Sequence, residues 1–170
     1  MTLGGNTAGP GGFTHLDERG RPRMVDVGAK EATRRTAVAE GRLITEPATV
    51  ALLQEGGGPK GDALAVARVA GIQGAKHTAD LIPLCHPLPL DRVVVVGEGD
   101  RAVRGVGGRA RASATARTGV EMEALSAVSA ALLTAYDMLK SLDRGMRIEG
   151  IQLLRKEGGR SGTWIRADQD

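Results

Sequence analysis

Aromatic residues are nearly absent from this chain. Its 170 residues include one Phe, one Tyr and one Trp. Proteins that bind single-stranded nucleic acids stack the bases on aromatic side chains, so the composition argues against that class. The net charge of +3, from 23 basic and 20 acidic residues, fits an anionic small molecule better. Because most apolar side chains are Ala, Val or Leu, we also expect close packing of helices and sheet and a large subunit interface.

Cysteine and long apolar runs are scarce as well. Cys85 is the single cysteine, so no intrachain disulfide can form, which suits a reducing compartment. No apolar run approaches the roughly 20 residues of a membrane span. The glycine-rich first residues contain no apolar stretch typical of a signal peptide. We therefore expect a cytoplasmic protein with neither a membrane partner nor a nucleic-acid partner.

The length fits one domain. Residues 1–12 are predicted to form a disordered glycine-rich tail, 13–166 a single folded domain, and 167–170 a frayed end. Alternation of small apolar and polar residues over 109–117 predicts a strand with Ala on its packed face. The opposite face carries Arg109 and Arg111, which could contact anions or simply be solvated.

The hydrophobic pattern along the whole chain predicts an α+β fold, with helices packed on one face of a mostly antiparallel sheet. The second helix is apolar around most of its circumference and should be buried. Extended segments are expected over 24–27, 35–43, 92–96, 109–117, 148–154 and 163–165, and helices over 47–56, 62–79 and 122–142.

The segment Leu81–Leu88 holds Cys85 and His86 between two prolines, which prevent a helix and stiffen the backbone. A rigid histidine is a candidate for chemistry, and a histidine packed in a core loop is the alternative. Adjacent Cys and His side chains cannot easily reach one ion, and a zinc site needs three or four ligands. We therefore predict no metal site here.

Lysines and an aspartate form two further candidates. Lys60 precedes a helix start after a glycine loop, where free N–H groups favour an anion, although a solvated lysine is the simpler interpretation. Asp137 and Lys140 are neighbours on the surface of the last helix. They could exchange protons or form an ordinary helix salt bridge.

Carboxylates flank Met122 where the last helix begins. If this segment is extended, Glu121 and Glu123 point to the same side and could accept hydrogen bonds from a guanine-like edge. Favourable charge at a helix N-terminus is the alternative. Fourteen residues separate Glu123 from Asp137, about 21 Å along a helix. One site using both therefore needs a long substrate or two subunits, and the second option predicts an active site at an interface.

The glycine loop Gly158–Gly162 follows the basic residue Lys156. Backbone amides in such a loop can bind phosphate, although a turn between two strands also explains the glycines. The GxxxxGK[ST] spacing of a Walker A loop is absent.

The order of several motifs resembles that of the cyclic pyranopterin monophosphate synthases, the molybdenum cofactor biosynthesis protein C family. The resemblance covers about residues 13–166, and its most specific segments are Leu84–Leu88 and Thr118–Leu125. The motifs are Met24–Val27, Lys60–Asp62, Ala70–Lys76, Leu81–Leu88, Thr118–Leu125, Tyr136–Met138 and Gly158–Gly162. The resemblance implies a ferredoxin-like fold and a homohexamer, a trimer of dimers, with active sites between subunits. It also implies conversion of 3′,8-cyclo-7,8-dihydroguanosine 5′-triphosphate to cyclic pyranopterin monophosphate, with loss of diphosphate.

The resemblance assigns roles to residues through these motifs. Catalytic roles fall to Asp137, Lys140 and Lys60. Substrate contacts fall to Leu84, Cys85, His86, Met122 and Glu123, with Glu121 a weaker candidate. Arg35, Lys76 and Lys156 are expected to hold the triphosphate. No cofactor or metal is implied, and whether Mg²⁺ accompanies the triphosphate is left open. His77 and Arg160 differ from the basic residues expected there, and 97–111 match the family weakly, so no role is carried over for that segment.

Two other functions remain alternatives. A metal-dependent nucleotide cyclohydrolase would use Cys85 and His86 and would contain stoichiometric zinc. A non-enzymatic oligomeric module for anions or RNA would show a steep salt dependence of RNA affinity.

Overall fold

The computed structural model describes residues 15–17, 19–100 and 104–167. The predicted tail 1–12 and residues 168–170 of the predicted frayed end lie outside this part. The elements in chain order are β1 (Thr33–Ile44), α1 (Pro47–Gln54), α2 (Ala63–Lys76), α3 (Thr78–Leu81), β2 (Arg92–Asp100), β3 (Gly105–Ala116), α4 (Glu121–Leu139), β4 (Arg147–Glu157) and β5 (Trp164–Ile165).

One antiparallel sheet contains all five strands, in the order β2-β3-β1-β4-β5. The central strand β1 pairs with β3 on one side and with β4 on the other. The chain connects β1 to β2 through α1–α3, and β3 to β4 through α4, which is the split β-α-β arrangement of ferredoxin-like folds. The prediction of an α+β fold is confirmed.

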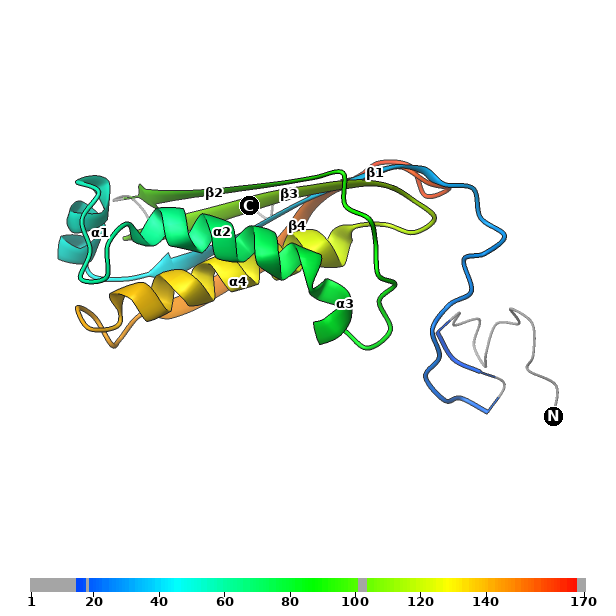
Figure 1. The fold of residues 1–170 in the computed structure, drawn as a ribbon, viewed down its shortest axis with the longest axis horizontal. Coiled ribbons are helices and arrows are strands. Elements are labelled where there is room, and N and C mark those ends of the chain that lie inside the picture. Colours follow the sequence, from blue (N-terminus) through cyan, green and yellow to red (C-terminus); the bar gives the residue numbers. More distant parts are fainter. Residues whose placement is uncertain (1–14, 18, 101–103, 168–170) are drawn as a thin grey trace.

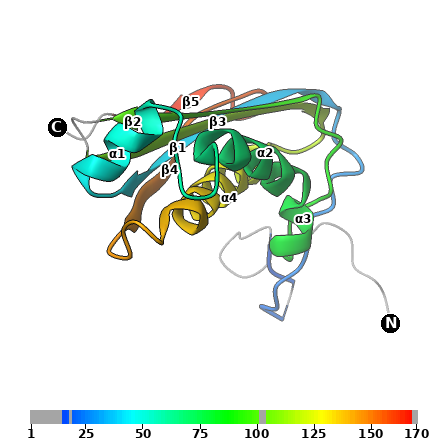
Figure 2. The ribbon, with the colours of Figure 1, turned by 60° about the vertical axis from the view of Figure 1, so that its left-hand side comes forward.

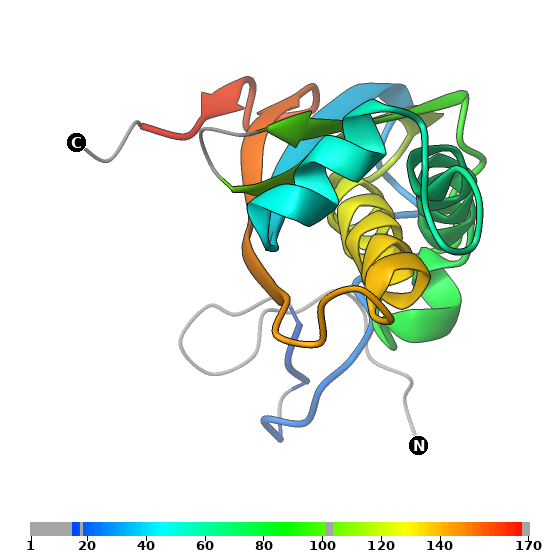
Figure 3. The ribbon, with the colours of Figure 1, turned by 90° about the vertical axis from the view of Figure 1, so that its left-hand side faces the viewer.

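Helices α2 and α4 cover one face of the sheet, and no helix of the described residues covers the other, which we call the open face (Figures 1 and 3). The alanines of β3 lie in the core as predicted, and Ala110, Ala112 and Ala114 are fully buried. Helix α2 packs very close to α4 at Gly74. A Cβ added to this glycine would lie only 2.6 Å from the Cβ of Ala130. Small side chains therefore permit the close packing that the composition predicts.

Helix α1 lies at one end of the sheet and α3 at the other (Figures 1 and 2). Helix α4 runs between these ends as the core helix. In the described part of the chain it alone is long and apolar enough to cross a membrane, but half of it is buried inside the fold. It is therefore only a weak sign of a membrane span.

The second predicted helix differs from the structure in two ways. It stops at Lys76 rather than continuing to 79, and the separate turn α3 follows. The Thr78 hydroxyl donates to the carbonyls of Gly74 and Ala75, which competes with continuation of the helix.

The prediction that this helix is buried holds for one face only. Its buried face consists of Ala63, Ala67, Gly71 and Ala75, whereas Val66 and Val69 are 44% and 68% exposed. The apolar residues beyond the core face thus lie on the outer surface of the helix layer.

Other boundaries also shift. The extended segment 24–27 belongs to no strand. Strands β2 and β3 extend through glycine-rich stretches to Asp100 and from Gly105, because cross-strand pairing there outweighs the poor strand propensity of glycine. Helix α4 begins at Glu121 and ends at Leu139, three residues before the predicted end.

Candidate active site

Lys60, Asp137 and Lys140 come together at the C-terminal end of α4, and we call them the cationic cluster. The carboxylate of Asp137 lies 2.6 Å from Lys140 Nζ and 2.9 Å from Lys60 Nζ. Hydrogen bonds first from Lys140 and then from Lys60 lower the pKa of Asp137 to about 2. The same contact raises the pKa of Lys140. All three side chains are about half exposed, so the cluster is open to a ligand or to another chain.

Two local structures hold the cationic cluster in place. Asp62 caps α2 by accepting from the Ala65 N–H at 2.9 Å, which fixes the turn that carries Lys60. Lys60 also donates to the backbone carbonyl of Asp137 at 3.0 Å, near the last turn of α4. Beyond that turn, the Asp143 carboxylate accepts from the Thr45 hydroxyl at 2.9 Å and from the Glu46 N–H at 3.1 Å. These bonds tie the end of α4 to the junction of β1 and α1.

A cavity of about 350 Å³ lies at the N-terminal end of α4, and we call it the carboxylate pocket. Its lining residues are His15, Val25, Val27, Lys30, Leu84, Cys85, His86, Leu88, Thr118, Gly119, Glu121, Met122 and Glu123. The six residues predicted to contact substrate from 84–86 and 121–123 therefore gather in one place, and the stiff Cys85–His86 segment forms part of the wall.

Burial controls ionisation in the carboxylate pocket. Glu123 is only 4% exposed, and burial, followed by the charge of Glu121, raises its pKa. Burial, followed by the charge of Glu123, likewise raises the pKa of the Cys85 thiol. Cys85 therefore stays a neutral thiol at physiological pH, which suits a packing or hydrogen-bonding role rather than a nucleophile.

Glu121 and Glu123 do not lie on an extended segment, so the condition for their pointing to the same side is not met. Both belong to the first turn of α4. Residues two apart in a helix point in widely different directions. Glu121 reaches Lys156 Nζ at 3.2 Å, while Glu123 is buried near Cys85.

Arg35 and Lys156 meet at the loop after β4. Lys156 Nζ donates to the Ser161 hydroxyl at 3.1 Å. The Arg35 guanidinium lies against the loop so closely that a Cβ at Gly159 would be 1.8 Å from its Nη1. Arg35 Nε is buried and has no hydrogen-bond partner in the described chain. The two cations and this free donor suit an anion beside the carboxylate pocket.

Lys76 joins neither cluster. It is exposed on the last turn of α2, at the same end of the helix layer as α3.

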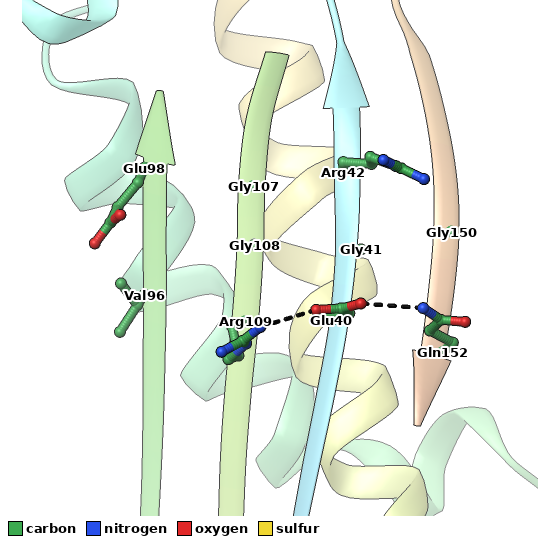
Figure 4. A pocket seen from close by; sticks show the side chains of 10 residues that line it. All are labelled: Glu40, Gly41, Arg42, Val96, Glu98, Gly107, Gly108, Arg109, Gly150 and Gln152. Atoms are coloured by element: carbon green, nitrogen blue, oxygen red, sulfur yellow. Dashed lines mark hydrogen bonds and ion pairs between the residues drawn. The ribbon is translucent and has the colours of Figure 1, made fainter. Parts of the chain in front are cut away.

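A second cavity, larger than the carboxylate pocket at about 560 Å³, lies on the open face of the sheet (Figure 4). Its floor includes Gly41, Gly107 and Gly108. The Glu40 carboxylate accepts from Arg109 and Gln152, both at 3.0 Å, and these contacts outweigh its desolvation to lower its pKa. None of the catalytic or substrate-contact residues implied by the resemblance lines this cavity. Arg109, the candidate for an anion contact on this face, is paired with Glu40 instead, so the size of the cavity alone does not make it the reactive site.

The two clusters lie at opposite ends of α4, because Glu121, Met122 and Glu123 belong to its first turn and Asp137 to its last. The helix rise places Glu123 and Asp137 about 21 Å apart. Within one chain, the cationic cluster therefore cannot act on a small group held in the carboxylate pocket.

Sequence reasoning missed several pocket residues from the N-terminal segment, namely His15, Val25, Val27 and Lys30. The motif Met24–Val27 was a signal for this segment, but it gave no role. Among the residues that the structure describes, no three His, Cys, Asp or Glu side chains gather as metal ligands do.

The chain is similar to a known family and to several of its members. A model of the MoaC family matches residues 24–159. The cyclic pyranopterin monophosphate synthase of Thermomicrobium roseum is 59% identical over 158 residues, covering 93% of this chain and 95% of that protein. The proteins of the same name from a Methylobacterium species and from Chloroflexus aggregans are 58% and 56% identical, over 89% and 92% of this chain and 95% and 94% of their own lengths.

Proposed function

Because this chain belongs to the MoaC family, we propose that it forms cyclic pyranopterin monophosphate, a step of molybdenum cofactor biosynthesis, as its relatives' name states. The substrate is 3′,8-cyclo-7,8-dihydroguanosine 5′-triphosphate, and diphosphate is released. The identity of more than half of all residues over nearly the full chain carries this conclusion.

The carboxylate pocket receives the guanine-derived ring in this proposal. Glu123 accepts hydrogen bonds from the amide and amino edge of the ring. Because Glu123 is buried, a ring that lacks these donors would leave its carboxylate without partners, at a cost in binding free energy, so the contact discriminates between ring systems. The segment Leu84–His86 and Met122 form the surrounding wall.

Arg35 and Lys156 hold the triphosphate together with Lys76, which lies apart from them within one chain and would come from a neighbouring copy. The partnerless Nε of Arg35 supports this role, because a buried donor gains most from an anionic acceptor. Cations near the phosphates also stabilise the negative charge that develops on the departing diphosphate.

The cationic cluster moves protons during ring opening, pterin closure and formation of the cyclic phosphate. Asp137 is ionised over the whole physiological range, because its pKa is about 2. It can hold Lys60 and Lys140 in place and accept a proton when substrate displaces one of them.

Two neighbouring copies complete each site. The separation of the two clusters supports this arrangement, since one copy's cationic cluster must approach another copy's carboxylate pocket. The helix layer also exposes Val66, Val69 and Leu133, the last at 62%, as apolar surface for a second copy. The proposed assembly is a homohexamer built as a trimer of dimers.

Mixing variants tests the shared site. Asp137→Asn and Glu123→Gln proteins, each impaired alone, are denatured together and reassembled. If two-fold dimers share their sites, about one quarter of the wild-type activity returns, because half of the dimers are mixed and each has one intact site. Activity no greater than the average of the two variants would contradict a shared site.

We also propose that no protein-bound metal takes part and that the protein is cytoplasmic. Metal analysis of the purified protein checks the first point, and stoichiometric zinc would favour the cyclohydrolase alternative. Activity with and without added Mg²⁺ shows whether that ion accompanies the triphosphate.

The direct test is incubation of the purified protein with the cyclic dihydroguanosine triphosphate. Diphosphate and the pterin product should appear in equal amounts. If the purified, assembled oligomer released neither product, the proposed function would be overturned.

A further inference from the structure

The N-terminal segment contributes one wall of the carboxylate pocket although it belongs to no strand. Residues 23–27 belong to no helix or strand, and their exposure alternates. Val25 and Val27 are half-buried and line the cavity, while Met24 and Asp26 are exposed. This alternation places every second side chain against the pocket, as in an edge strand without a partner.

A turn at the end of this wall fixes the position of Lys30. The Asp26 carboxylate accepts from the Gly28 N–H at 2.8 Å. The Lys30 N–H then donates to the Val27 carbonyl at 3.0 Å. These two bonds reverse the chain directly after Val27, so that Lys30 lines the same cavity as the two valines.

Charge makes Lys30 stand out among the lining residues. It is the one Lys or Arg among them, and it forms no ion pair in the described chain. Glu121, which also lines the cavity, is already paired with Lys156. A single unpaired ammonium group on a cavity wall is therefore available to an anionic ligand.

We propose that Lys30 is a substrate-binding residue whose ammonium group binds a phosphate oxygen of the triphosphate. It acts together with Arg35 and Lys156, which lie at the loop between β4 and β5, where Lys156 pairs with the lining residue Glu121. Val25 and Val27 supply an apolar surface for the ring. This inference rests on the proposed function for the identity of the substrate, but the binding of a polyphosphate at Lys30 can be measured separately.

The experiment compares Lys30→Met with wild type, with Lys30→Arg, and with Arg19→Met, a matched loss of charge on the same segment outside the pocket lining. Lys30→Met should raise KM about tenfold, the cost of one charge-assisted hydrogen bond, and change kcat less than about twofold. Lys30→Arg should stay near wild type because it keeps the charge, and Arg19→Met should not change either constant. A KM for Lys30→Met equal to that of Arg19→Met, or a loss confined to kcat, would overturn the proposal.

Calorimetric binding of inorganic triphosphate provides a readout without turnover. Lys30→Met should bind it about tenfold more weakly than wild type, and equal affinities would refute the assignment. If wild type makes no product but the variant still loses affinity for triphosphate, the proposed function fails while the role of Lys30 stands.

Discussion

The two ends of α4 each carry a carboxylate, and the two carboxylates are in opposite electrostatic situations. Glu123 is buried, and its pKa is raised by that burial. Asp137 is 56% exposed, and two lysines lower its pKa to about 2. The comparison shows that solvent exposure and neighbouring cations, rather than residue type, decide what a carboxyl group can do. In the proposed function, the buried Glu123 discriminates between ligands, and the exposed, ion-paired Asp137 takes part in proton transfer.

The largest effect is expected at the exposed end. Asp137→Asn removes the proton acceptor but keeps the shape of the side chain. We expect kcat to fall by about 10²- to 10⁴-fold, the range for loss of a general acid or base. Steady-state kinetics measures this, and substrate affinity determined by calorimetry should remain within a few-fold. Normal turnover would contradict the assigned role.

The next effect is expected at the buried end. Glu123→Gln keeps one acceptor but loses the charge that strengthens its hydrogen bonds. A charged hydrogen bond contributes about 1.5–3 kcal/mol, so affinity for substrate should fall about 10- to 100-fold. Comparing KM and kcat separates the two ends of the helix. If Glu123→Gln lowered kcat as much as Asp137→Asn and left KM unchanged, the binding role assigned to Glu123 would be contradicted.

The same Glu123→Gln variant should be more stable than wild type at neutral pH. The pKa of Glu123 is raised from 4.5 in the folded chain, so folding is favoured with the carboxyl neutral and loses that stability as pH rises through the folded-state pKa. Removing the charge therefore raises the melting temperature at pH 7–8, by about 2–4 °C for each kcal/mol. Melting curves from pH 4 to pH 8 should show the gain shrinking toward acid, and a gain independent of pH would point to another cause.

Lys140→Met should disturb the exposed end without unfolding it. Lys140 is the largest cause of the lowered pKa of Asp137, so its removal should raise that pKa from about 2 toward the ordinary 3.8. An NMR titration of the Asp137 carboxyl carbon measures the shift. Lys60→Met should give a smaller shift in the same direction, and the reverse ranking would show that the contact with Lys60 dominates.

The smallest effect is expected for Glu121→Gln. Its ion pair with Lys156 is partly exposed, and such pairs contribute about 0–1 kcal/mol to stability. Chemical denaturation should therefore show little change in the free energy of unfolding, in contrast to its buried neighbour Glu123.

Much of the fold could be predicted from local pattern. The alternation over 109–117 and the long apolar stripe of α4 each reflect one element packing against one core, and both elements are confirmed. The break at His77 could not be predicted, because it depends on how the Thr78 side chain competes for carbonyls. The burial of α2 was overestimated because its apolar outer face has no partner within one chain.

The candidate site could be predicted only in part from the sequence. Spacing along α4 already indicated that Glu123 and Asp137 could not meet in one chain. The contact of Lys60 with Asp137 joins residues 77 positions apart, so the motif order suggested it but only the fold shows it. A role for Lys30 could not be predicted, because its local sequence is the same as that of a solvated surface lysine and only the fold places it at the pocket.

The glycines that bring α2 against α4 also set a mechanical limit. Gly74 leaves no room for a methyl group beside Ala130, and Gly71 leaves little beside the Ala127 carbonyl. This close packing fixes the position of α2 relative to α4 and therefore the position of Lys60 relative to Asp137. A methyl group added at Gly74 would push the two helices apart and shift Lys60 away from Asp137. We therefore expect Gly74→Ala to lower turnover although Gly74 contacts no group of the proposed site.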